Sequence, residues 1–180
     1  MPTIQICNPT APTPARVQSG AGPIAQLNGA RVAILNNGWM SMSLISERLA
    51  ERLPADYGVS SVVVHRVEPN GGATAEVLES VAATADVAIV GLANCGGCTS
   101  WSVQNQLTLM KRGIYSVLLV TQRYKTLAEF ICRGRGMGDA PCVVLPITES
   151  TEYGAREEMA AIADQALRGA VELLAIRRAA

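Results

Sequence analysis

The stretch Asp86–Thr121, "DVAIVGLANCGGCTSWSVQNQLTLMKRGIYSVLLVT", decides the fold. It opens with an apolar run at Asp86–Leu92, which is typical of a strand buried on both faces. The segment Trp101–Gly113 predicts a helix that closes with lysine, arginine and a C′ glycine. The run Tyr115–Thr121 predicts a second buried strand. Strand, helix and strand in this order indicate two parallel strands joined by a crossover helix.

The same alternation continues on both sides of this unit. Further strands are expected at Ala30–Asn37, Val59–Val67 and Pro141–Ile147. Further helices are expected at Ser43–Leu53, Thr74–Ala85 and Ala155–Ile176, and near Leu127–Gly134. Strands that are apolar throughout and alternate with amphipathic helices indicate a parallel sheet covered on both faces. We therefore predict an α/β fold, a flavodoxin-like doubly wound parallel sheet with the strand order 2-1-3-4-5.

Residues 1–28 differ from the rest: they are rich in proline, threonine and glycine and show no sustained period. We predict an extended N-terminal arm, with a short strand at Ile4–Cys7, laid over the domain or over a neighbouring subunit. Residues 29–180 are expected to form a single α/β domain. The start lacks the regions of a signal peptide, and no apolar run approaches the roughly twenty residues that cross a bilayer. A cytoplasmic protein with reduced thiols and no membrane partner is expected.

The composition excludes some partners. Lys plus Arg number 15 and Asp plus Glu number 15, and no basic stripe stands out, so nucleic acid is not expected as a partner. Aromatic residues make up 4% of the chain, which favours close packing of helices on a sheet. The cysteine count of 5 is odd and the chain is long, which argues against a disulfide scaffold.

The predicted topology places a small-molecule site at the carboxyl ends of the strands, beside the switch point. The loops Asn36–Ser43 and Ala93–Ser100 should form opposite walls of one crevice there. The candidate substrate-binding residues are Asn36, Asn37, Ser41, Asn94, Thr99, Ser100 and Arg123. The asparagines and serines of the first loop fit turn and N-cap roles equally well. Trp39 and Trp101 flank the crevice and either wall it or pack against a partner.

The Cys-Gly-Gly-Cys turn, residues 95–98, is the strongest chemical signal. Its glycines allow a tight backbone path and leave both sulfurs uncovered. Cys98, Thr99 and Ser100 should occupy the first turn of a helix, where unpaired N–H groups and the positive end of the dipole favour a thiolate. We predict Cys95 as the nucleophile, because it precedes the helix and its sulfur can face the crevice. Cys98 would resolve an intermediate on Cys95 as a disulfide.

Other interpretations of this turn stay open. Structural zinc usually takes four ligands, and the single histidine, His65, ends a different strand. The glycines do not follow the G-x-G-x-x-G order of a dinucleotide-binding loop. The two cysteines would also fit a packed interior as small hydrophobes, which is what we expect of Cys132 and Cys142. No metal and no cofactor is predicted.

The stretch "AIVGLANCGGCTSWSV" resembles the motif of the UGSC-type (seleno)proteins, a selenocysteine- or cysteine-Gly-Ser-Cys sequence that follows a strand. Cys95 stands at the selenocysteine or cysteine position, and Cys98 at the second cysteine. The resemblance extends to "NPTAP" in the arm, "LNGARVAILNNG" around the first strand and "LMKRGIYSVLLVT", which runs into the fourth. It implies a reactive Cys95 position, because selenium serves nucleophilic or redox chemistry.

The chain departs from that family pattern at three places. Asn94 stands where members often carry an acidic residue, and Gln104-Asn105 stands where they often carry His-Asp. The segment "LPIT" lacks the histidine that commonly follows the last strand. Amides hold hydrogen bonds but do not move protons at neutral pH. Either the chemistry needs no such base, or another subunit supplies it.

Together these features predict a thiol-dependent enzyme, or a subunit of one, that reduces or attacks a small-molecule substrate through Cys95 and Cys98. One alternative is a non-catalytic structural or regulatory subunit of a heteromeric enzyme. Another is a metal–thiolate site completed by Cys7, Cys132 or a partner chain. The polar arm and the missing base favour a homo-oligomer or a hetero-oligomer, the latter with a related subunit.

Overall fold

The computed structural model describes residues 15, 19–68, 71–147 and 156–176. The predicted strand at Ile4–Cys7 lies outside the described residues. The described residues form a five-stranded sheet in the order β2-β1-β3-β4-β5, and all its neighbouring strands are parallel. The strands are β1 (Arg31–Asn36), β2 (Ser61–Arg66), β3 (Val87–Ala93), β4 (Tyr115–Thr121) and β5 (Cys142–Leu145). The predicted flavodoxin-like order is confirmed.

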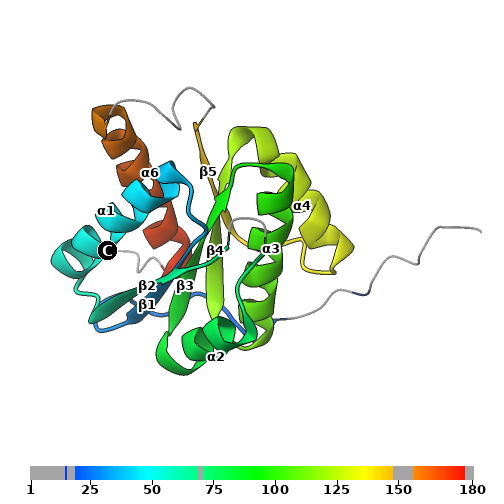
Figure 1. Ribbon diagram of the computed structural model, residues 1–180. Helices are drawn as coiled ribbons and strands as arrows, with labels where there is room; N and C mark the ends of the chain where they lie inside the picture. The colour runs from blue at the N-terminus through cyan, green and yellow to red at the C-terminus, as the bar shows by residue number, and fades with distance from the viewer. Residues whose placement is uncertain (1–14, 16–18, 69–70, 148–155, 177–180) are drawn as a thin grey trace, which may run out of the picture.

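Helices cover both faces of this sheet (Figure 1). They are α1 (Met40–Tyr57), α2 (Ala75–Thr84), α3 (Gly96–Lys111), α4 (Lys125–Gly134) and α6 (Arg156–Leu174), with a 3₁₀ turn η1 (Gln122–Tyr124) before α4. The helices α1 and α6 pack on one face, and α2, α3 and α4 pack on the other. The helices α1, α2, α3 and α4 each cross over between parallel strands, whereas α6 follows the last strand, and the sheet is wound in both directions from β1.

The two faces of the sheet carry separate apolar cores. In β1, Val32 and Ile34 face α1 and α6, whereas Ala33 and Leu35 face α2 and α3. Successive side chains of a strand point to opposite faces, so a strand covered on both sides must be apolar at every position. This is why the central strands appear in the sequence as unbroken apolar runs.

Helix α1 is longer than the sequence pattern indicates. The predicted end at Leu53 precedes Pro54, but the helix continues to Tyr57. Pro54 has no N–H to bond to the carbonyl oxygen of Ala50, and its ring crowds that carbonyl, yet the helix continues past it. The helix instead ends at Gly58, whose left-handed backbone (φ 66°) lets its N–H reach the carbonyl oxygens of Leu53 and Pro54.

Strand β2 corrects one expectation. We expect every strand to be covered on both faces, yet Val63 is 46% exposed and Val64 is 43% exposed. Because β2 is an edge strand, only β1 pairs with it. Helix α2 packs against α3 rather than over β2. The β-branched sequence of β2 therefore marks a strand without marking a buried one.

The last residues of the predicted arm lie against the domain. The Ile24 N–H donates to the carbonyl oxygen of Leu174, and the Ile176 N–H donates to that of Ile24, both at 2.9 Å. Leu27 is buried in the core beneath α1 and α6. Among the helices of the described residues, none has the length and apolarity that crossing a membrane requires.

Candidate active site

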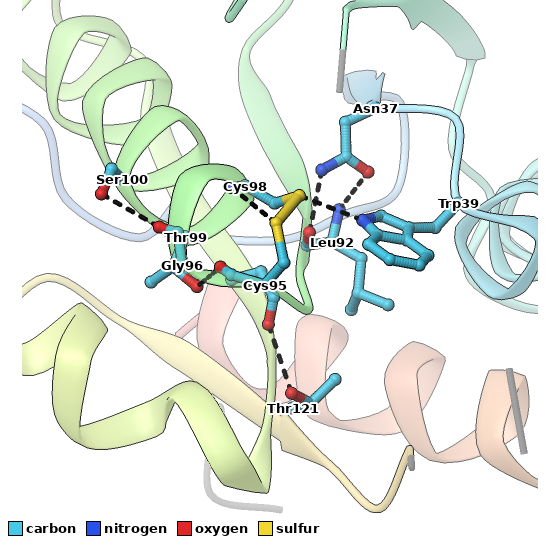
Figure 2. Close-up of a disulfide and its surroundings, with 10 residues drawn as sticks. Asn37, Trp39, Leu92, Cys95, Gly96, Cys98, Thr99, Ser100 and Thr121 are labelled. Carbon is cyan, nitrogen blue, oxygen red and sulfur yellow. Dashed lines mark hydrogen bonds between the residues drawn. A yellow bond between two sulfur atoms is a disulfide. The ribbon is translucent and has the colours of Figure 1, made fainter. Parts of the chain in front are cut away.

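Cys95 occupies the N-cap of α3, directly after β3. Its backbone is extended (φ −150°, ψ 171°), and its Sγ accepts the N–H of Cys98 at 3.0 Å (Figure 2). The sulfur thus takes the place of the serine or aspartate oxygen that usually satisfies a free N–H at a helix start. The helix begins at Gly96, earlier than the predicted first turn at residues 98–100. The strand-to-helix turn therefore presents the Cys95 sulfur at the positive end of α3.

The two cysteines of the turn form a disulfide with each other, with their Cα atoms 5.1 Å apart. Cys95 is half-buried, whereas Cys98 is only 1% exposed. Gly96 and Gly97 lie in the helix and are exposed, and neither has a positive φ. The two glycines therefore adopt ordinary helical backbone rather than the tight turn that we expect from the sequence. At Gly96, an added Cβ would meet nothing within 4 Å. The glycines leave the Cys95 side of the disulfide open.

Trp39 contacts the other sulfur. Its indole Nε1–H donates to Cys98 Sγ at 3.3 Å (Figure 2). Trp39 is half-buried against the core beneath α1 and α6, and it is the residue before the first turn of α1. The sequence analysis places this ring at the crevice but misses the hydrogen bond. No sequence signal marks it, because the donor and the sulfur are 59 residues apart.

Asn37 joins the first of the two loops to the end of β3, just before the second loop begins. Its Nδ2 donates to the Leu92 carbonyl oxygen at 2.8 Å, and its Oδ1 accepts the Leu92 N–H at 2.7 Å. The side chain is 3% exposed, and Leu92 follows Gly91 through a cis peptide bond. Asn37 thus fastens the loop that carries Trp39 to the end of β3, which leads into Cys95. Figure 2 shows the amide beside the disulfide.

The remaining candidates of the first loop are also engaged within the protein. Asn36 Oδ1 accepts the Gly38 N–H at 2.8 Å, which forms an Asx turn, and its Nδ2 donates to Ser43 Oγ at 3.4 Å. Ser41 is fully buried in the first turn of α1. The Asn36 contact fits a turn role, whereas the N-cap of α1 is Trp39 and no side chain caps this helix. Substrate binding by Asn36, Asn37 and Ser41 stays a prediction.

The second wall contains three candidates, half-buried Asn94, buried Thr99 and exposed Ser100, and the fourth candidate, Arg123, follows β4. Thr99 is fully buried, and its hydroxyl donates to the Cys95 carbonyl oxygen at 2.6 Å. Ser100 is exposed, although its hydroxyl donates to the Gly96 carbonyl oxygen at 3.1 Å. Arg123 is exposed after β4, with its guanidinium 5.7 Å from the centre of the Tyr124 ring. Binding by these four residues stays a prediction.

Thr121 is a polar residue of the site that the sequence analysis does not single out. It ends β4 and is fully buried, and its hydroxyl donates to the Ala93 carbonyl oxygen at 3.4 Å. The signal for it is a polar residue at the carboxyl end of a buried strand. It links β4 to the residues that lead into the turn.

The amides that replace the expected acid–base residues have structural contacts. Asn105 is 4% exposed, and its Oδ1 accepts the Ala73 N–H at 3.1 Å, which ties α3 to the loop before α2. Gln104 donates from Nε2 to Thr108 Oγ1 at 3.3 Å, one turn further along α3. Trp101 lies over Gly72 on that same loop and is 42% exposed. This part of α3 anchors a loop.

The other thiols of the described chain are unsuited to chemistry. Cys132 is buried, and burial, with a smaller contribution from Cys142, raises its pKa to about 11. Burial likewise raises the pKa of Cys142. Both therefore stay protonated at neutral pH, as expected of core thiols. Within the described residues, no group of three His, Cys, Asp or Glu side chains is arranged to hold a metal ion. Cys7, which the metal alternative invokes, lies outside them.

Surface hollows of about 410, 250 and 350 Å³ lie elsewhere on the described chain. The first is lined by the start of the domain, the end of α1 and the end of α6, and the second by α1 and α6. The third lies beside residues 19–23 and 136–140. The cysteine pair instead sits where two loops meet through direct hydrogen bonds.

One comparison with known proteins identifies a family for this chain. The family model described as the UGSC family matches residues 5–176, which is nearly the whole chain. A comparison with the curated proteins found no match. The family match includes the whole sheet and the Cys95–Cys98 pair. The chain therefore belongs to the UGSC family.

Proposed function

We propose that this chain is a thiol-dependent oxidoreductase, or a subunit of one, whose Cys95–Cys98 pair exchanges two electrons with a small molecule that carries an electrophilic sulfur. The observation that carries the proposal is the disulfide at the start of α3, with Cys95 half-buried and Cys98 buried. A pair with one accessible sulfur reacts in a defined order. Cys95 meets the substrate, and Cys98 completes the reaction.

The proposed reduction balances within the pair and its substrate. The Cys95 thiolate attacks one sulfur of a substrate disulfide, whose bond breaks, and the leaving thiolate takes a proton from water. The Cys98 thiolate then attacks Cys95 Sγ, which releases the second substrate thiol and forms the Cys95–Cys98 disulfide. The dithiol is oxidised by two electrons, and the substrate disulfide is reduced to two thiols.

The first contacts of the turn support this order. When the pair is reduced, the Cys98 N–H and the positive end of α3 lie where they stabilise a negative charge on Cys95 Sγ. A thiolate formed in this way needs no neighbouring base. The reaction can therefore proceed although amides, Gln104 and Asn105, stand where a base and its carboxylate are expected. Both amides have structural contacts instead.

A non-catalytic subunit of a heteromeric enzyme is the second candidate. The amides at positions 104 and 105 favour it, because Asn105 is committed to the Ala73 N–H and leaves no proton carrier there. In that case a related chain would supply the base, and this chain would be a structural subunit of the enzyme. The metal–thiolate alternative would need both sulfurs as reduced ligands.

We place this reaction in the cytoplasm. A cytoplasmic location provides a pool of small thiols that returns the disulfide to the dithiol, so no separate cofactor is part of the cycle. The expected partners are a small-molecule substrate and further subunits, and nucleic acid is not among them. The exposed valines of β2 support an oligomer, since an uncovered edge strand invites pairing.

Exchange with glutathione disulfide tests this function. The purified chain, reduced and freed of reductant, should reduce it, with formation of the Cys95–Cys98 disulfide followed by mass spectrometry. The Cys95→Ser variant should lose the reaction, and Cys98→Ser should accumulate a mixed disulfide on Cys95. The matched control Cys142→Ser should keep the rate. A Cys95→Ser variant as active as the parent chain would contradict the proposal.

A further inference from the structure

We infer that Trp39 is a positioning residue that decides which sulfur of the disulfide leaves, by holding its indole N–H against Cys98 Sγ; this inference rests on the proposed exchange at Cys95 and Cys98. The indole nitrogen can only donate a hydrogen bond. A disulfide sulfur is a weak acceptor and a thiolate is a strong one, so the Trp39 bond strengthens as charge develops on Cys98.

The environment of Cys98 makes this donor necessary. Cys98 is 1% exposed, so water cannot solvate a thiolate that forms there. An uncompensated charge at a buried sulfur is costly, and a thiol that ionises reluctantly is a poor leaving group. The Trp39 Nε1–H, 3.3 Å from Cys98 Sγ, is a donor that lies outside the turn itself. It supplies part of the stabilisation that water would otherwise give.

The two sulfurs are distinguished by their donors. Cys95 Sγ accepts a backbone N–H, that of Cys98, whereas Cys98 Sγ accepts a side-chain N–H, that of Trp39 (Figure 2). The backbone donor is present in every variant of the turn. The Trp39 donor is a property of the loop between β1 and α1, and it can be removed by substitution.

The loop holds the indole in place from both sides. Asn37, two residues earlier, is bound to the Leu92 backbone through two hydrogen bonds. On the other side, the Trp39 carbonyl oxygen accepts the Ser43 N–H at 2.9 Å and the Ser43 hydroxyl at 3.1 Å. A donor fixed before the reaction costs no reorganisation when the charge appears.

The step that Trp39 directs is the opening of the disulfide by a thiolate. The thiolate attacks Cys95 Sγ, the Cys95–Cys98 bond breaks, and the electron pair of that bond goes to Cys98 Sγ. The Trp39 N–H stabilises the negative charge that forms there. The products are a mixed disulfide on Cys95 and a Cys98 thiolate. A second thiolate attacks the mixed disulfide and releases Cys95, so two thiols are oxidised to a disulfide while the pair is reduced.

The test uses glutathione and the oxidised full-length chain in a single opening event, quenched with iodoacetamide. Mass spectrometry should find glutathione on Cys95 and the alkyl group on Cys98. Trp39→Phe, which keeps a ring but removes the donor, should slow the opening by roughly tenfold, the effect of losing one hydrogen bond to a charged group. The matched control Trp101→Phe should open at the parental rate.

A second readout is independent of the exchange reaction. In a Cys95→Ser background, the pH at which the Cys98 thiolate forms, followed by ultraviolet absorbance, should rise when Trp39 becomes Phe. Where Trp39→Phe disturbs folding, replacement of Trp39 by benzothienylalanine keeps the ring shape and removes only the donor. An unchanged titration and opening rate in a folded variant would overturn the inference, as would glutathione found equally on both cysteines. Failure of the proposed function would appear separately, as absence of turnover with glutathione disulfide.

Discussion

At the scale of single residues, Cys95 Sγ has two roles. It caps α3 by accepting the Cys98 N–H, and it is the accessible end of the disulfide. Serine can perform the first role, because its oxygen accepts the same N–H, but it cannot perform the second. Substitution by serine therefore separates the chemistry of this position from its contribution to the helix.

Gly91 is a position where a side chain does not fit. A Cβ there would lie 2.8 Å from Met42 Sδ and 3.1 Å from Leu119 Cβ, inside the core beneath α1 and α6. We expect Gly91→Ala to lower the free energy of unfolding by about 1–3 kcal/mol through overpacking, measured by urea unfolding. Gly96→Ala is the control, because its Cβ would meet nothing within 4 Å. Equal stability of the two variants would contradict this account of packing at Gly91.

His65 gives the chain a pH dependence near neutrality. Its Nε2 is buried without a hydrogen-bond partner, and burial lowers the pKa of the imidazole from its ordinary value of 6.5. Above pH 6.5 the ring is neutral in both folded and unfolded chains. Below it, the unfolded chain binds the proton first, so stability falls until the pH reaches the lowered pKa of the folded state.

We therefore expect the free energy of unfolding to fall between pH 7.5 and pH 5.5. The His65→Gln variant should lose part of this fall, because it removes the group that titrates. Urea unfolding at the two pH values measures both. A fall of the same size in the variant would assign the pH dependence to other groups.

At the scale of elements, the site depends on how the β1–α1 loop meets the end of β3. Both polar atoms of the Asn37 amide bind the Leu92 backbone, in a position that is 3% exposed. The contact lets β1 and β3, neighbours in the sheet, carry Trp39 and Cys95 to the same place. Residues in two loops thus act on one disulfide.

We expect Asn37→Ala to reduce stability by about 2 kcal/mol or more, because it leaves a buried N–H and a buried C=O of Leu92 without partners. The same variant should slow opening of the disulfide, since Trp39 is no longer held against Cys98. Urea unfolding and the glutathione reaction measure the two effects. Thr84→Ala, which alters an exposed hydroxyl at the end of α2, away from the site, is the comparison and should change neither. Unaltered opening in a destabilised Asn37→Ala chain would separate stability from positioning.

At the scale of the whole molecule, the two edges of the sheet differ. β5 spans only Cys142–Leu145, whereas β2 offers six residues with exposed Val63 and Val64. Natural sheets usually shield such an edge with charges or cover it. This favours a subunit interface along β2 in the proposed oligomer.

We expect native mass spectrometry to detect at least a dimer, with roughly 1,000 Å² or more buried. Val63→Lys should shift the population toward monomer, because it places a charge on the edge, whereas Phe130→Lys on α4 is a control at an exposed apolar residue of another element. Deletion of residues 1–18 tests whether the arm contributes. A parent chain that stays monomeric at micromolar concentration and remains fully active would refute the oligomer.

The sequence alone determined the layers, the strand order and which two loops meet beside the switch point. Apolar runs, helical periods and glycine boundaries are local properties, and short crossovers leave few topologies open. Two predictions were wrong in part: the end of α1 at Leu53, and the burial of β2 on both faces. A proline does not always end a helix at the residue before it, since α1 continues to Tyr57 past Pro54. An edge strand also has the same β-branched composition as a central one.

Only the tertiary structure decided how the side chains of the site meet. The Trp39–Cys98 and Asn37–Leu92 contacts join residues 59 and 55 positions apart, across two strands. Sequence patterns state which face of an element is apolar, but the direction of one indole N–H depends on where whole elements pack. The Cys-Gly-Gly-Cys spacing by itself brings the two sulfurs close. Which of them is open and which is buried follows from the packing of α3 against the sheet and of the β1–α1 loop against the turn.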